Sequence, residues 1–176
     1  MLVALPHLFL GDTILAQGQY DRAKPLYDEV LAMFQATGFD WGLIEAHAGL
    51  GGATYCAGNL VDATAHYAES LERAWDLSLD QFMVSSLLGL AGIAAESGSP
   101  EQGARLFGAA EGVGARLEAP IFPRDHPVRA RARAALTQVL GERRLAAARE
   151  SGRALTLDQA VAEAKTVAEM ITGLPD

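Results

Sequence analysis

The stretch Leu50-Gly-Gly-Ala-Thr-Tyr-Cys-Ala-Gly58, continued to Tyr67 (LGGATYCAGNLVDATAHY, residues 50–67), decides the fold of this chain. Its marks are a Leu-Gly pair, a glycine seven residues later, an alanine after five more and an aromatic residue after four more. The same marks recur forty residues earlier and, partly eroded, forty residues later: Leu10-Gly11, Gly18, Ala23 and Tyr27, then Leu90-Ala91, Gly98, Gly103 and Phe107. A fixed period of this size indicates a repeat protein.

Each mark has a physical reason. A glycine after the leucine lets a neighbouring helix approach closely, and the next glycine suits the positive φ of a chain reversal. The alanine and the aromatic residue fall on one face of a second helix, where the ring fills the space that the small residues leave. This spacing resembles the tetratricopeptide repeat. The period of 40 exceeds the roughly 34 residues usual in that family, and we expect the extra residues to lengthen the second helix and the following turn.

The composition favours an all-α fold, because helix formers dominate and no stretch alternates like a half-buried strand. We expect residues 1–118 to form three helix pairs of tetratricopeptide type in a superhelix. Asp40 and Asp80 are predicted N-caps, each between hydrophobic residues placed as a staple. The predicted helices span residues 4–17, 20–36, 40–57, 60–77, 80–97 and 100–118.

Residues 119–176 are predicted to form a helical cap continuous with the array, so that the chain is one domain. Residues 119–127 hold Pro120, Pro123 and Pro127, which favour an extended link. Two short helices are expected near 127–139 and 142–150, divided at Leu140-Gly141 and closed by Ser151-Gly152. Thr156 and Gln159 fit a capping box for a last helix at 157–171, which we expect to cover the open end of the stack.

The C-terminal half carries a narrower resemblance. The runs Ala104-Arg-Leu-Phe-Gly-Ala-Ala-Glu111, Leu140-Gly-Glu142 and Gly152-Arg-Ala-Leu-Thr-Leu-Asp-Gln-Ala-Val161 resemble the tail of bacterial LuxR-type ATPase transcriptional regulators and related nucleotide cyclases. That resemblance implies a helical sensor region that follows an effector domain and a nucleotide-binding switch domain. No phosphate-binding Gly-x-x-x-x-Gly-Lys-Ser/Thr loop occurs, so only the sensor role is implied.

Charge and cysteine content narrow the class of protein. The single Cys56 fits a reducing compartment, and no secretory leader or membrane span is predicted, so we expect a cytoplasmic protein. The net charge is −8, with acidic repeats and a basic segment at 119–153, which argues against nucleic acid as the partner of the repeats. The arginines of that segment have three readings: a solvated helical face, contacts with the acidic repeats or another domain, or contacts with nucleic acid. They are Arg129, Arg131, Arg133, Arg143, Arg144 and Arg149.

The first predicted helix is apolar nearly all round, whereas the end unit of a solenoid normally has a polar outer face. We expect either that the chain is a fragment of a longer protein or that it forms a homodimer through this end. The expected self-association surface includes Leu5, Leu8 and Phe9.

The first helices of successive pairs line the concave groove of such an array. Aligning the repeats places five side chains near that groove: Asp12, Glu45, Tyr55, Ser85 and Glu96. The carboxylates favour a cationic peptide or amine, and the tyrosine can stack or hydrogen-bond. The expected partner is therefore a protein or peptide, or alternatively a small ligand.

An enzyme is not expected, because no acid–base pair, nucleophile or metal-ligand constellation stands out. His7 and His47 occupy equivalent repeat positions, while His66 and His126 look isolated; packing or surface roles are expected, with no metal and no cofactor. The leading hypothesis is a non-catalytic interaction or ligand-sensing module of a bacterial signalling regulator. The alternative is a structural module that oligomerises through its first helix.

Overall fold

The structure is a computed structural model and describes residues 3–119 and 121–173; Pro120, expected in the link, lies outside them. Within those residues the chain forms α-helices and one short 3₁₀ helix and has no strand. The elements are α1 (Ala4–Ala16), α2 (Tyr20–Thr37), α3 (Asp40–Ala57), α4 (Leu60–Asp76), η1 (Asp80–Phe82), α5 (Met83–Glu96), α6 (Pro100–Arg116), α7 (Asp125–Arg153) and α8 (Leu157–Thr172).

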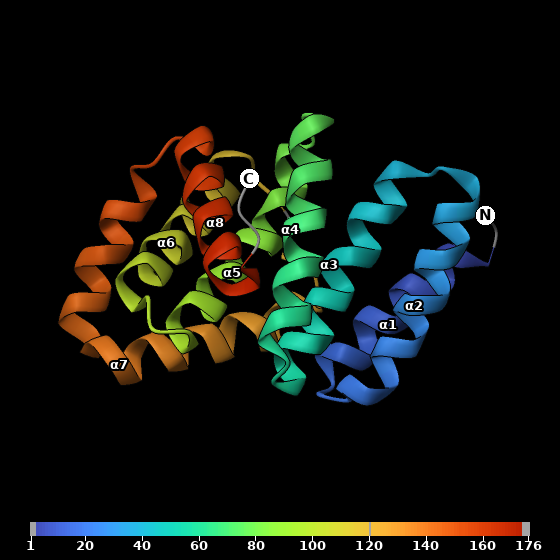
Figure 1. Ribbon diagram of the computed structural model, residues 1–176, viewed down its shortest axis with the longest axis horizontal. Helices are drawn as coiled ribbons and strands as arrows, with labels where there is room; N and C mark the ends of the chain where they lie inside the picture. The colour runs from blue at the N-terminus through green and yellow to red at the C-terminus, as the bar shows by residue number, and fades with distance from the viewer. Residues whose placement is uncertain (1–2, 120, 174–176) are drawn as a thin grey trace.

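Consecutive helices pack as pairs, α1 with α2, α3 with α4 and α5 with α6, and the pairs stack side by side (Figure 1). The all-α helical-repeat fold is thus confirmed. The expected bounds of these helices hold to within a few residues, and only the start of the fifth differs in kind, because η1 precedes α5. No helix among the described residues is long and apolar enough to cross a membrane.

The reversals within the pairs use the predicted glycines. Gly18, Gly58 and Gly98 have φ of 76°, 95° and 91°. A residue with a Cβ is strained in this left-handed region, which is why glycine recurs there with the period of the repeat.

Two tyrosines hold the pairs together. The ring of Tyr27 fills the space beside Gly11 of its own pair and Gly49 of the next pair. Tyr67 lies in the same way between Gly51 and Gly89. A Cβ at any of these glycines would collide with the ring, so the helices approach as closely as they do only because the side chains are absent.

The predicted N-caps are wrong. The residues before α3 and η1 are Phe39 and Leu79, neither of which caps with its side chain. Asp40 and Asp80 lie one position further on, as the first residues of those helices. A carboxylate in the first turn is favoured by the positive end of the helix dipole, so aspartate stabilises this position without acting as a cap.

The C-terminal region contains the two expected helices, but their outer ends differ from the prediction. The predicted division at Gly141 exists, with φ of 71° and ψ of 160° inside α7. However, α7 already begins at Asp125 and continues through Gly152 to Arg153 instead of ending at Ser151-Gly152. Gly152 is needed inside the helix because a Cβ there would collide with the backbone of Arg105 in α6. The capping box of Thr156 and Gln159 is confirmed.

The last helix does not cover the end of the stack. Instead, α8 packs along α4, α5 and α6, while α7 crosses α1, α3 and α5 and then bends beside α6 (Figure 1). Gly108 and Gly112 of α6 admit the backbone of Arg149 and Arg153. The end of the stack is therefore covered by the part of α7 that follows Gly141, because that glycine lets the helix turn around α6.

Candidate functional site

The five residues expected at the groove come from the first helices of the three pairs. Asp12 lies on α1, Glu45 and Tyr55 on α3, and Ser85 and Glu96 on α5. The structure brings all five against one short segment of the same chain, residues 124–131 at the start of α7. We call this segment the plug. It consists of Arg124, Asp125, Arg131 and the residues between them.

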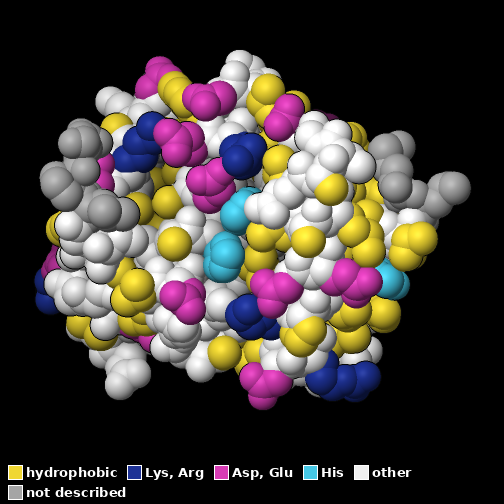
Figure 2. All heavy atoms as spheres, turned by 45° about the vertical axis from the view of Figure 1, so that its right-hand side comes forward, with side chains coloured by type: hydrophobic (Ala, Val, Ile, Leu, Met, Phe, Trp, Pro, Cys, Tyr) yellow, Lys and Arg dark blue, Asp and Glu magenta, His cyan; other side chains and the backbone are white. Residues whose placement is uncertain are grey.

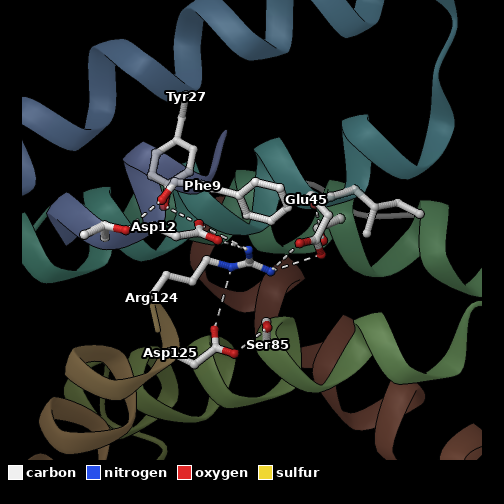
Figure 3. Close-up of polar contacts among 10 residues, drawn as sticks. Phe9, Asp12, Tyr27, Glu45, Ser85, Arg124 and Asp125 are labelled. Atoms are coloured by element: carbon white, nitrogen blue, oxygen red, sulfur yellow. Dashed lines mark hydrogen bonds and ion pairs between the residues drawn. The ribbon is translucent and has the colours of Figure 1, made fainter. Parts of the chain in front are cut away.

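Arg124 is the centre of these contacts (Figure 3). Its Nη1 donates to both carboxylate oxygens of Asp12 at 3.1 and 3.2 Å, and its Nη2 lies 3.0 and 2.9 Å from the two oxygens of Glu45. The guanidinium also lies over the ring of Phe122, 4.5 Å from the centroid. Only 1% of the arginine side chain is exposed, so this is a desolvated ion cluster rather than a surface salt bridge.

Two hydroxyl groups complete the cluster. Tyr27 donates to Asp12 at 2.7 Å, and Ser85 donates to Asp125 at 2.9 Å. The second carboxylate oxygen of Asp125 lies 3.9 Å from Nε of Arg124, and that Nε has no hydrogen-bond partner. One guanidinium thus faces three carboxylates. Burial raises the pKa of Glu45 and of Asp125 against the opposing effect of Arg124.

A second arginine, Arg131, binds the remaining two of the five residues, Tyr55 and Glu96. Arg131 makes a bidentate pair with Glu96, at 2.8 and 2.7 Å, and donates to the carbonyl oxygens of Tyr55 and Cys56. Its guanidinium lies over the Tyr55 ring, whose hydroxyl donates to Glu96 at 2.8 Å. Hydrogen bonding from Arg131 lowers the pKa of Glu96, so this carboxylate is held ionised.

The side chains expected to line a groove are therefore bound by the chain itself, and the arginines that bind them have the cationic chemistry that these residues favour. Sequence reasoning missed Arg124 and Asp125, which stand in the proline-containing segment that was expected to be an extended link. A usable signal existed: Asp12 and Glu45 occupy a helix face that is otherwise apolar. Buried carboxylates need a cation, and the segment after residue 119 is the basic part of the chain.

The basic segment mostly contacts the acidic repeats, which was one of the readings given above. Glu111 of α6 accepts from Arg129 at 2.9 Å, Arg149 at 2.8 Å and Arg153 at 3.0 Å. Arg144 pairs with Glu101. Arg133 and Arg143 are exposed, as a solvated helical face requires.

His66 is not isolated, contrary to expectation. Its Nδ1 lies 3.2 Å from Nδ1 of His47, and the two rings are 5.4 Å apart. In the space-filling view two histidine side chains lie side by side among charged residues (Figure 2). Among the described residues no group of three or more His, Cys, Asp or Glu side chains could hold a metal ion.

Replacing His47 by phenylalanine should make the protein less sensitive to mild acid. Burial and the neighbouring His66 lower the pKa of His47 to about 4, against about 6.5 in an unfolded chain. Folding thus disfavours protonation, so the stability from this residue is complete above about pH 6.5 and is lost as the pH falls toward 4. Because the ring is only partly buried, we expect a loss of about 1 kcal/mol in the wild type between pH 7 and 5.

The measurement is thermal unfolding followed by circular dichroism at pH 7, 6 and 5. The exposed His126, changed to glutamine, serves as control and should leave the wild-type pH dependence unaltered. An equal pH dependence in His47→Phe and the wild type would contradict the assignment.

The residues expected at a self-association surface do not lie together. Leu8 is fully buried in the core between the first two pairs, so it cannot contribute to an interface. Leu5 is half-buried against the same core, and Phe9 is 54% exposed. Val3 and Leu10 are also exposed, at 57% and 47%. We call Val3, Phe9 and Leu10 the end face; apolar side chains gather over this N-terminal part of the molecule (Figure 2).

Comparison with known proteins identifies the repeat type. Residues 2–74 match the family model of the tetratricopeptide repeat. This range takes in α1 to α3 and most of α4, the first two helix pairs of the stack. Repeats of this type generally mediate protein–protein interactions. Neither the curated proteins nor the solved structures contain a match to the chain.

Proposed function

We propose that this chain is a non-catalytic protein-interaction module of a bacterial signalling or transcriptional regulator. The tetratricopeptide match supports the interaction role. The regulator context rests on the resemblance of the tail motifs between residues 104 and 164. These motifs have a packing role in the structure, since Gly108 and Gly152 let α6 and α7 approach closely.

The plug changes where a partner can bind. The side chains expected to line the concave groove are already engaged by Arg124, Asp125 and Arg131. A partner at this face would have to remove a buried arginine from its carboxylates, which is costly because an unpaired buried charge remains. We propose that the groove holds the C-terminal region in place and that the partner docks on the end face.

The end face is the observation that carries this proposal. Leu10 is 47% exposed, whereas Leu50 and Leu90, its equivalents one and two periods later, are 0% exposed. Those two leucines are covered because a preceding helix pair packs beside them. The end face thus exposes side chains at positions that the other two pairs use for packing between pairs, and exposed apolar residues of this kind mark interaction sites.

Phe9 favours a second copy of this chain as the neighbour. Its equivalents Gly49 and Gly89 receive the rings of Tyr27 and Tyr67 from the preceding pair. A side chain at this position collides with such a ring, so a pair carrying the same tyrosine does not fit beside α1. Two copies related by a twofold axis bring Phe9 and Leu10 of each against the other and need no tyrosine.

Replacing Phe9 by glutamate should convert a dimer to a monomer. A charge in an apolar interface loses its hydration without gaining a partner, so the dissociation constant of the dimer should increase by at least about a hundredfold. The mass is measured by light scattering coupled to size exclusion over a concentration series. Val61, an equally exposed valine on α4 at 56%, provides the control, and Val61→Glu should remain dimeric.

A wild-type protein that stays monomeric at every concentration would overturn the second copy as occupant. Equal dissociation of Phe9→Glu and Val61→Glu would overturn the end face as the interface.

A further inference from the structure

A pocket of about 490 Å³ lies between α5, α6 and α7, away from the end face and outside the concave groove. Its walls are mostly apolar and small, with Val84 and Leu88 from α5, Ala110 and Ala115 from α6, and Ile121 from the link. A volume of this size and a lining of this kind are typical of small-molecule sites.

The polar side chains at the pocket include more guanidinium groups than carboxylates. Arg129 and Arg153 line it beside Glu111, and Arg149 joins the same carboxylate. Three guanidinium groups thus share one carboxylate whose side chain is only 13% exposed. Arg153 also reaches the exposed Glu150 at 3.2 Å. The arginines therefore keep unused N–H donors and an excess of positive charge at the mouth of the pocket.

Two further charged groups lie near the pocket, and neither neutralises this positive charge. Arg116 adds a fourth guanidinium, which donates to the carbonyl oxygens of Arg153 and Leu155 rather than to a carboxylate. Asp125 also lines the pocket, but its carboxylate is held by Ser85 and faces Arg124, and only 9% of its side chain is exposed. The anions near the pocket are therefore engaged, while the cations are not saturated.

We propose that this pocket binds a small amphipathic anion, with its apolar body against α5 and α6 and its carboxylate at Arg129 and Arg153. The apolar wall selects a hydrocarbon or aromatic body, and the guanidinium groups select a carboxylate, with which they form charge-assisted hydrogen bonds. The site is independent of self-association through the end face. Its walls belong both to the third helix pair and to the plug, so an occupant contacts the array and α7 together.

Calorimetric titration of the full chain with three probes that share one alkyl tail tests this assignment. Octanoate should bind with a Kd of about 0.1 to 1 mM, as expected for a ligand of this size. Octan-1-ol should bind about tenfold more weakly, because it lacks the charge that the arginines recognise. Octylamine should not bind.

Variants locate the site. Arg129→Gln should weaken octanoate binding about tenfold, while Arg143→Gln, an exposed arginine on the same helix, should leave it unchanged. Gly114 faces Val84 across the pocket, with 3.7 Å between its added Cβ and that side chain, so Gly114→Leu should fill the cavity and abolish binding. Ala115→Trp is a second filling variant, and the unfolding temperature of each variant shows whether it is folded.

Three results would overturn the assignment. The first is octylamine binding as tightly as octanoate. The second is no binding of octanoate at concentrations tenfold above the expected Kd. The third is unchanged octanoate binding in folded Gly114→Leu and Ala115→Trp proteins.

Discussion

Replacing Arg124 by methionine is expected to lower the free energy of unfolding by about 3 to 5 kcal/mol, the range found when one partner of a buried ion pair is removed. Asp12 and Glu45 then remain buried without the guanidinium that both of them contact. Methionine keeps most of the side-chain volume, so the loss reports the missing charge rather than a cavity. Urea unfolding followed by circular dichroism gives the difference.

Two controls separate charge from packing. Arg133→Met changes an exposed arginine on the same helix and should alter stability by no more than about 0.5 kcal/mol. The triple variant Arg124→Met, Asp12→Asn, Glu45→Gln removes the uncompensated charges, so it should recover part of the loss. An Arg124→Met protein within about 1 kcal/mol of the wild type would mean that the cluster contributes little beyond its hydrogen bonds.

Replacing Gly108 by alanine should destabilise the protein by about 3 kcal/mol, although alanine is the better helix former. The added Cβ would collide with the backbone carbonyl of Arg149, and α6 and α7 must then separate along their crossing. The backbone of Arg149 cannot rotate away from the added Cβ, as a flexible side chain could. The same change at Gly114 meets only Val84 at 3.7 Å, an ordinary contact.

Gly114→Ala is therefore the matched control, on the same helix and with the same change in propensity. It should raise stability by about 0.5 to 1 kcal/mol, because alanine loses less backbone entropy than glycine in a helix. The difference between the two variants in the free energy of unfolding, measured with urea, gives the energetic cost of the added Cβ where α6 and α7 cross. Equal effects of Gly108→Ala and Gly114→Ala would show that α7 can move without cost.

The fold could be predicted because its signals are local and periodic. Gly58 and its equivalents need a left-handed φ, and Tyr67 needs small residues opposite it, so both recur every forty residues. The helix bounds followed from these positions. The capping of α3 and η1 was wrong by one residue because aspartate is favoured both at the N-cap and just inside the first turn.

Carboxylates of the candidate site could be predicted from the sequence, but the arginine that binds Asp12 and Glu45 could not. The repeat placed Asp12, Glu45 and Glu96 on one face and indicated a cationic occupant. It could not indicate that the occupant is Arg124, because that contact spans 112 residues along the chain and depends on the path of α7. Gly152 was read as a helix end for the same reason, since its packing partner in α6 is remote in sequence.

The path of α7 also affects how freely the helix pairs can move against one another. Each pair in such a stack contacts only its neighbours, so small changes in the rotation between pairs can add up along the array. Here one arginine ties the first pair to the second, and the helix that follows it runs along the third. Arg124 and the helix that follows it thus connect all three pairs, and we expect this connection to restrict the rotation of one pair against the next.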